Sequence, residues 1–108
     1  MSKYRAKKTE IDGIKFDSKK EAKRYIALRE LEREGSIEKL TLQPRFLLQE
    51  GFRKNGKAYR KIEYVADFMY QQDGKLIVED VKGIKTDVYK LKQKLFEKRY
   101  QDLTIKEI

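Results

Sequence analysis

The chain has 108 residues, and we expect residues 1–108 to form a single domain. Charged residues make up 42% of it, and 27 lysines and arginines against 18 acids give a net charge of +9, which favours a polyanionic partner such as DNA, RNA or an anionic membrane surface. The chain contains no cysteine and no histidine. Disulfides, thiol chemistry and zinc–thiolate sites are therefore excluded, and any catalysis must use carboxylates, lysines, tyrosines or a hard cation bound by carboxylates.

The first third of the chain predicts a short hairpin followed by a helix. Polar and apolar residues alternate on both sides of a turn dipeptide in residues 9–16. Ser18 and Glu21 form a capping box, which predicts a helix start, and Gly35 predicts its end. An apolar stripe along the predicted helix consists of Ala22, Tyr25, Leu28 and Leu31.

The middle of the chain predicts four strands in succession. Pro44 ends the first strand, and Asn55-Gly56, set among basic residues, predicts an exposed hairpin tip between the second and the third. A second turn separates the third strand from the fourth. The predicted strands cover residues 37–44, 45–52, 62–70 and 75–82.

A second helix and a short strand are predicted at the end of the chain. Thr86 and Asp87 begin the helix, and Val88, Leu91 and Leu95 are spaced to form its apolar face. Residues 103–108 form a strand, so that a right-handed crossover places it parallel to the strand of residues 75–82. The order predicts an α/β (α+β) fold, with a mixed central sheet flanked by helices and an N-terminal hairpin.

Two acids and a lysine interrupt the apolar run of the strand predicted for residues 75–82. Side chains alternate between the faces of a strand, so Asp80 and Lys82 share one face with Leu76 and Val78. Glu79 points to the opposite face with its own apolar neighbours, Ile77 and Val81.

Asp67, on the preceding strand, is expected to share a face with Val65 and Met69. If the two strands pair, Asp67 and Asp80 converge, and two such carboxylates repel each other unless a proton or a cation lies between them. Magnesium takes oxygen ligands of this kind, and Lys82 could orient an attacking water or neutralise charge on a phosphate. The pattern indicates metal-assisted hydrolysis of a phosphodiester.

An alternative is that Asp80 and Lys82 form an ordinary ion pair and Asp67 is solvated. The acid-x-lysine pattern alone has little specificity, because the same chain repeats it at Asp17–Lys19, Glu21–Lys23 and Asp73–Lys75.

Asp67 followed by Asp80-Val81-Lys82 at the end of the next strand resembles the motif of the PD-(D/E)xK, or restriction-endonuclease-like, nuclease superfamily. The segments "GIKFDSKKEAKRY", "YVADF" and "EDVKG" are similar to its small phage-encoded members over roughly Lys3 to Ile105. The resemblance implies an αβββαβ core, Mg²⁺ (with Mn²⁺ as a substitute) held by Asp67, Asp80 and the Val81 carbonyl, and a catalytic Lys82. The chain departs from the motif at Ala66, where the motif has proline.

Glu21 has two interpretations. As part of the capping box, its carboxylate would reach back to the Ser18 amide. The resemblance implies instead a catalytic and metal-binding acid from the first helix, and the position of Glu21 on the apolar stripe agrees with this. Gln43, near a strand end, is a further candidate for the edge of the site.

Basic residues outside the acid cluster are candidates for DNA contact. Lys92 could reach a phosphate from the second helix, or it could extend past core side chains into water. Tyr4 and Tyr59, set among basic residues, are candidates for base stacking. The expected DNA-contacting residues are Lys7, Lys8, Lys54, Lys57, Arg60, Lys61 and Lys92.

These observations predict a magnesium-dependent DNA endonuclease, with branched or junction DNA as the substrate suggested by the resemblance. A non-catalytic basic nucleic-acid-binding protein on the same fold is the alternative. We expect DNA as partner, no membrane association, a homodimer and a cytoplasmic location, in the host cell if the protein is phage-encoded. The expectation of no membrane rests on the absence of an apolar run near ~20 residues and of a hydrophobic N-terminal segment.

Overall fold

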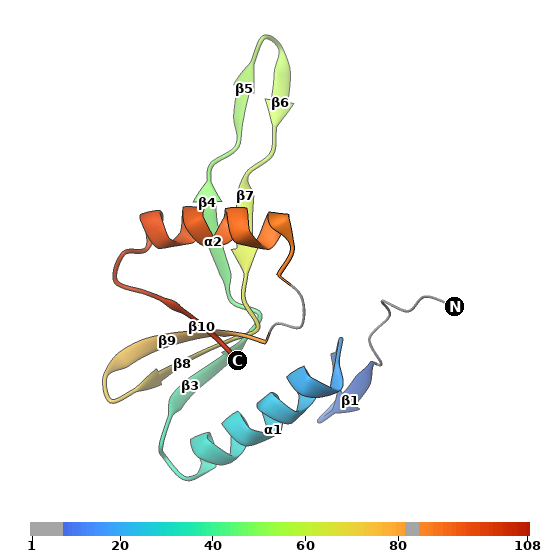
Figure 1. The fold of residues 1–108 in the computed structure, drawn as a ribbon, viewed down its shortest axis with the longest axis vertical. Coiled ribbons are helices and arrows are strands. Elements are labelled where there is room, and N and C mark those ends of the chain that lie inside the picture. The colour runs from blue at the N-terminus through green and yellow to red at the C-terminus, as the bar shows by residue number, and fades with distance from the viewer. Residues whose placement is uncertain (1–7, 82–84) are drawn as a thin grey trace.

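A computed structural model describes residues 8–81 and 85–108 as a mixed α and β protein, as the sequence predicts (Figure 1). No helix in these residues is long and apolar enough to cross a membrane. The elements in chain order are β1 Thr9–Ile11, β2 Ile14–Phe16, α1 Lys19–Arg33, β3 Glu38–Leu42, β4 Arg45–Gln49, β5 Phe52–Lys54, β6 Lys57–Tyr59, β7 Ile62–Val65, β8 Phe68–Gln72, β9 Lys75–Asp80, α2 Asp87–Arg99 and β10 Ile105–Glu107.

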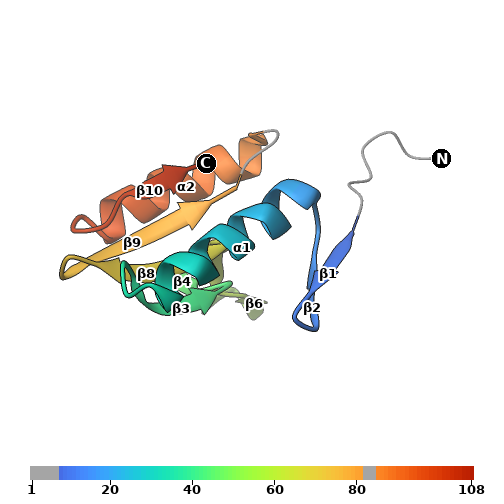
Figure 2. The ribbon, with the colours of Figure 1, turned by 90° about the horizontal axis from the view of Figure 1, so that it is seen from below.

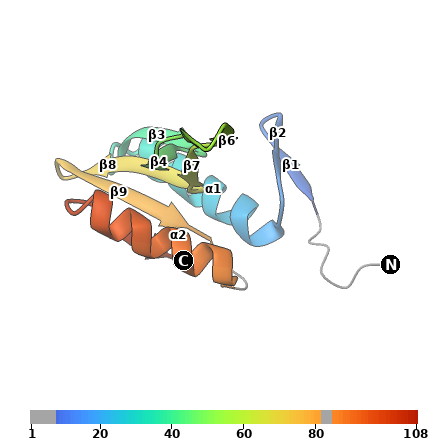
Figure 3. The same ribbon diagram turned by 90° about the horizontal axis from the view of Figure 1, so that it is seen from above.

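A four-stranded sheet in the order β10-β9-β8-β3 forms the centre of the molecule. Strand β9 is antiparallel to β8 and parallel to β10, which confirms the predicted parallel pairing across α2. Helix α1 packs on one face of the sheet and α2 on the other (Figure 2). The predicted N-terminal hairpin is β1 and β2, which lie at the N-terminal end of α1 (Figure 3).

A long hairpin with a bend in the middle links the sheet to a second, two-stranded layer. Strands β3 and β4 run antiparallel to β8 and β7, and the pairing continues through the bend by hydrogen bonds from Ala66 N to Pro44 O (3.1 Å) and from Gln43 N to Asp67 O (3.0 Å). Gln43 takes a positive φ of 51° there. The single strand predicted for residues 62–70 is therefore wrong: it breaks at Ala66 and Asp67 into β7 and β8.

The far end of this hairpin is β5 and β6, which contact chiefly each other and project away from the helices (Figure 1). We call residues 52–59 the arm. The predicted turn is confirmed, because Asn55 and Gly56 both have positive φ, at 53° and 76°. A turn of this kind follows the natural twist of two antiparallel strands, and glycine adopts it without strain.

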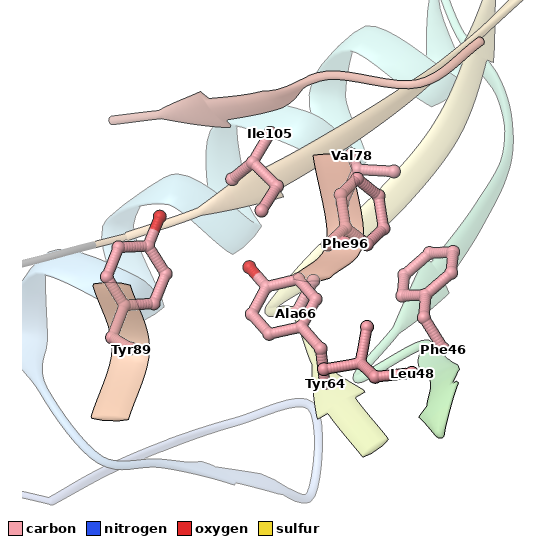
Figure 4. Close-up of a cluster of buried hydrophobic side chains, with 8 residues drawn as sticks. All are labelled: Phe46, Leu48, Tyr64, Ala66, Val78, Tyr89, Phe96 and Ile105. Carbon is pink, nitrogen blue, oxygen red and sulfur yellow. The ribbon is translucent and has the colours of Figure 1, made fainter. Parts of the chain in front are cut away.

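Two separate clusters of buried side chains hold the helices to the sheet. The α1-side core consists of Phe16, Ala22, Tyr25, Leu28, Ile37, Phe68 and Tyr70. The α2-side core consists of Phe46, Leu48, Tyr64, Ala66, Val78, Tyr89, Phe96 and Ile105, which Figure 4 shows gathered between α2 and the strands.

The apolar face predicted for the second helix is partly wrong. Val88 and Leu91 are 61% and 59% exposed, whereas Tyr89 and Phe96 are buried. The two aromatic residues are seven positions apart and so lie on one side of the helix, where they bury more apolar area than the aliphatic pair would. Leu95 packs against the edge of the α2-side core, as predicted.

Candidate active site

The acids of the candidate site lie where strands β8 and β9 separate. Phe68 pairs with Glu79 in the register of these strands, so Asp67 and Asp80 stand together at the end of the ladder. Beyond that pair the ladder changes: Asp67 N donates to Glu79 O (3.1 Å), and Val81 N donates to the Asp67 side chain at Oδ2 (2.7 Å). The Asp67 carboxylate thus accepts a hydrogen bond from a backbone amide at the point where the strands diverge.

Asp80 is buried on the α2 side of the sheet, with 1% of its surface exposed. The Tyr64 hydroxyl donates a hydrogen bond to Asp80 Oδ2, and Figure 4 shows Tyr64 within the α2-side core. Val78 shares this face, as predicted. Burial and the Asp80 carboxylate raise the pKa of Tyr64 far above its ordinary value, so the phenol keeps its proton and remains a donor.

Strict alternation fails across the break between β7 and β8. Tyr64 and Ala66 face the α2-side core, whereas Phe68 and Tyr70 face the α1-side core. The expectation that Val65 shares a face with Asp67 and Met69 is therefore wrong for Val65, which is 40% exposed. Even-numbered residues point toward α2 before the bend, and odd-numbered residues such as Met69 point toward it after the bend.

Glu79 points to the opposite side from Asp80, as predicted, and it belongs to a different set of interactions. Its side chain is 0% exposed and accepts two hydrogen bonds from Arg24 of α1, to Oε1 at 2.7 Å and to Oε2 at 2.6 Å. The Tyr70 hydroxyl donates to the same carboxylate. The hydrogen bond from Arg24 raises the pKa of that guanidinium, and burial raises the pKa of Tyr70 to about 12. Glu79 therefore fastens α1 to the sheet.

Glu21 lies in the first turn of α1 and takes part in the acid cluster. Ser18 is the N-cap, and its Oγ accepts a hydrogen bond from Glu21 N (3.1 Å), which confirms the Ser18 half of the predicted capping box. The Glu21 carboxyl also interacts with the Asp17 backbone and with the Asp67 side chain, and both interactions lower its pKa. Burial raises the pKa of Glu21, and the charges of Asp17 and Asp80 add to this effect.

Asp67 is the most strongly perturbed of these acids. Burial, a hydrogen bond with Asp80 and the charges of Asp80 and Glu21 together raise its pKa to about 8, although the Val81 amide opposes the shift. A carboxyl with that pKa holds a proton at neutral pH in the metal-free protein. The proton removes the repulsion between neighbouring carboxylates when no other group compensates their charge.

A small cavity of about 140 Å³ opens beside Glu21 and Asp67. Lys15 from β2 and Gln43 from the bend in the hairpin line it, together with Ile14, Phe16 and Leu42. Gln43 thus lies at the edge of the site, as expected, but Lys15 was not predicted from the sequence. Its position in a separate hairpin gives no local signal for this contact.

The donor set fits a hard divalent cation in its chemistry. Within residues 8–81 and 85–108, no group of three or more His, Cys, Asp or Glu side chains is gathered as a ready metal site. Magnesium, however, commonly takes only one or two carboxylates and completes its shell with water and substrate oxygens. A cation bound by Asp67 and Asp80 would replace the proton that Asp67 holds. Glu21 interacts with Asp67, and the charge of Asp80 adds to the rise of its pKa.

Other predicted site residues are placed as follows. Lys82 and Lys7 lie outside the described residues. Val81 contributes its amide to Asp67 and packs its side chain at the edge of the α1-side core. Lys92 is half-buried on α2, and it lies three residues after Tyr89 and four before Phe96, so it is on the same side of the helix as these two residues.

The expected DNA-contacting lysines and arginine of the arm region are exposed. Lys54 and Lys57 flank the turn, and Arg60 and Lys61 follow β6. Lys61 Nζ lies 3.7 Å from Glu63, so part of its charge is compensated. Lys8 is exposed before β1, on a different part of the surface.

Sequence reasoning missed a further polar group at the end of β10. Glu107 pairs in register with Asp80, accepts a hydrogen bond from the Tyr89 hydroxyl (2.7 Å) and lies 2.8 Å from Lys85 Nζ. Ile108 N also donates to the Asp80 carbonyl (3.0 Å). The parallel pairing of β10 with β9 brings these groups beside Asp80, and no short-range sequence motif predicts that proximity.

Of three comparisons with known proteins, one gives a match, and that match covers the whole chain. No curated protein and no solved structure matches it. A family model does match residues 1–108, and the chain belongs to that family, DUF1064, described as "Protein of unknown function".

Proposed function

We propose that the protein is a metal-dependent deoxyribonuclease of the restriction-endonuclease-like type, which hydrolyses DNA phosphodiester bonds. The observation that carries this proposal is the convergence of Asp67 and Asp80 at the divergence of two strands, with Glu21 beside them. The proposal is supported by the order of helices and strands, with a mixed sheet between two helices. It is also supported by the net charge of +9, which suits a polyanionic substrate.

Asp67 and Asp80 would hold Mg²⁺, and Glu21 and the Val81 carbonyl are the further ligands that the resemblance implies. When bound, the cation supplies positive charge that polarises a phosphate oxygen and acidifies an attacking water. Tyr64 holds one oxygen of Asp80, and the Val81 amide holds one oxygen of Asp67. These two contacts fix the directions of the carboxylates before substrate arrives, which is the preorganisation that such a site needs.

Lys82, two residues after Asp80, is the expected catalytic lysine by resemblance. Its ammonium group would orient the water that attacks phosphorus, or neutralise charge that develops on the phosphate. Lys15, which lines the small cavity beside Asp67, is a second cation able to contact a phosphate near the acids.

A non-catalytic DNA-binding protein is the second candidate, and a specific observation favours it. Both acids have partners within the protein, since Tyr64 binds Asp80 and the Val81 amide binds Asp67. The acid cluster could therefore be a structural feature of a basic protein that binds DNA without cutting it.

One assay separates the two functions. Plasmid, single-stranded DNA and a four-way junction are incubated with Mg²⁺ or Mn²⁺ and the wild-type protein, Asp80→Asn or Lys82→Ala. Nuclease function predicts cutting by the wild type alone, with DNA binding retained by both variants. Equal binding without cutting by all three proteins would support the binding protein, and cutting by either variant at the wild-type rate would refute the site.

A further inference from the structure

The arm carries two exposed aromatic rings that neither core uses. Phe52 and Tyr59 are directly opposite each other on β5 and β6, with ring centroids 4.7 Å apart and ring planes within 9° of parallel. Even so, 45% of Phe52 and 40% of Tyr59 remain exposed. Cross-strand stacking accounts for the contact between the rings and stabilises the hairpin, but it does not account for the apolar surface that is left in water.

Two lysines stand beside the rings on the same face of the arm. Lys54 pairs with Lys57 in the register, two residues nearer the tip than the pair of Phe52 and Tyr59. Positions two apart share a face of a strand, so the face presents a rung of two rings and then a rung of two cations, roughly 7 Å apart. Lys57 Nζ lies 5.0 Å from the centre of the Tyr59 ring, which holds this cation close to the aromatic surface.

This pattern matches the chemistry of a nucleotide whose base is not stacked in a duplex. Proteins bind single strands by stacking bases on aromatic side chains while basic groups contact the phosphates. In a duplex each base face is covered by its neighbours, so an aromatic platform of this kind has access only to an unpaired or displaced base. The cations alone would serve duplex and single strand alike.

We infer that the arm is a binding site for unpaired DNA nucleotides, in which the Phe52–Tyr59 pair stacks on a base and Lys54 and Lys57 contact its phosphates. The choice of DNA rests on the proposed function. The arm projects beyond the sheet, away from both helices (Figure 1). The preferred substrate is accordingly a duplex with a single-stranded flap or a branch, in which duplex and unpaired DNA lie side by side.

Binding without cleavage tests this inference. Fluorescence anisotropy in EDTA measures the affinity of the full chain for a labelled duplex, a single strand and a duplex with a flap. The wild type is expected to bind the flap at least about 10-fold more tightly than the duplex. The double variant Phe52→Leu with Tyr59→Leu keeps apolar side chains but removes the rings, and it should lose that preference while its duplex affinity changes by less than about 2-fold. Ile26→Ala, which truncates a similarly exposed apolar residue on α1, should behave as the wild type.

A second readout protects the test against loss of the hairpin in the double variant. A 2-aminopurine base placed in the flap should lose fluorescence when the wild-type protein stacks on it, and should keep it with the double variant. Equal wild-type affinity for flap and duplex, an unchanged preference in the double variant, or no quenching by the wild type would each overturn the inference.

The outcome is separable from that of the proposed function. Cleavage with Mg²⁺ but no flap preference would refute the role of the arm alone. Flap preference and quenching without any cleavage would refute the nuclease and leave the binding site intact.

Discussion

The amide of Val81 donates a 2.7 Å hydrogen bond to Oδ2 of Asp67, across the point where β8 and β9 separate. This contact exists because the ladder between the strands shifts there, with Asp67 N bonded to the Glu79 carbonyl. The shift leaves Asp67 beside Asp80. The Asp67 carboxylate accepts the hydrogen bond that a backbone carbonyl would accept in a regular ladder. The site is therefore a product of the strand break, and its properties can be tested through the residues that hold it.

Asp67→Asn should change how stability depends on pH in the metal-free protein. The carboxyl of Asp67 has a pKa of about 8 when folded against an ordinary value of 3.8, so the folded state binds a proton that the unfolded state releases. The stability that this proton contributes is fully present below about pH 4 and is lost as the pH rises through about 8. Asparagine does not titrate, so the variant should gain stability relative to the wild type from pH 5 to pH 8.5, as measured by urea unfolding in EDTA.

Asp102→Asn, at an exposed acid after α2, provides the matched control and should follow the wild-type pH profile. A difference between Asp67→Asn and the wild type that stays constant over this pH range would contradict the raised pKa.

Tyr64→Phe should weaken both stability and the acid site. The change removes the donor to a buried carboxylate, which costs about 1–3 kcal/mol of unfolding free energy. Tyr70→Phe makes the same chemical change on the other face of the sheet, where the hydroxyl donates to Glu79. Both variants should be destabilised in urea, but only Tyr64→Phe should reduce Mn²⁺ affinity and cleavage. Equal functional losses would show that Tyr64 acts only through stability.

Arg24→Met should destabilise the protein by about 3–5 kcal/mol, because it leaves the fully buried Glu79 carboxylate without its cation. Arg33→Met is a close control: Arg33 also lies on α1 and makes a 2.6 Å ion pair with Glu30, but both side chains are exposed. That change should cost less than about 1 kcal/mol. Adding Glu79→Gln to Arg24→Met should restore part of the loss, since no charge is then buried. Similar unfolding energies for the two arginine variants would contradict the role of Glu79 as the anchor of α1.

Lys54→Gln with Lys57→Gln should reduce the salt dependence of DNA binding. Each phosphate contact adds about 0.9 to the slope of log K against log salt for duplex DNA, so removing two contacts should lower the slope by about 2. Lys75→Gln with Lys98→Gln removes the same charge from the start of β9 and the end of α2, away from the acids. Anisotropy titrations between about 50 and 200 mM salt should show the change only for the arm variant. Identical slopes for both pairs would indicate a general effect of net charge.

Local signals in the sequence predicted much of the fold. Asn55-Gly56 predicted the tip of the arm and Ser18 with Glu21 predicted the start of α1, because turns and caps depend on neighbouring residues. The inward face of α2 was not predicted, because Val88 and Leu91 offered an apolar stripe as regular as that of Tyr89 and Phe96. Only packing against the sheet decides between the two.

The candidate site could be predicted in part, because some of its contacts also join neighbouring elements of the chain. Pairing of adjacent strands brought Asp67 to Asp80 and put Glu79 on the other face. The strand break at Asp67 could not be predicted from the sequence, since it depends on the bend of the whole hairpin. Because the break changes which residues face α2, the position of Tyr64 was not predicted either. Arg24 is 55 residues from Glu79, and a contact at that separation leaves no periodic signal.

Anomalous diffraction from a crystal soaked in Mn²⁺ tests the central claim most directly. The account predicts a peak bonded to oxygens of both Asp67 and Asp80 in the wild type, and its loss in Asp80→Asn. An absence of any peak at saturating Mn²⁺, or a peak remote from both carboxylates, would contradict a metal-dependent site at the divergence of β8 and β9.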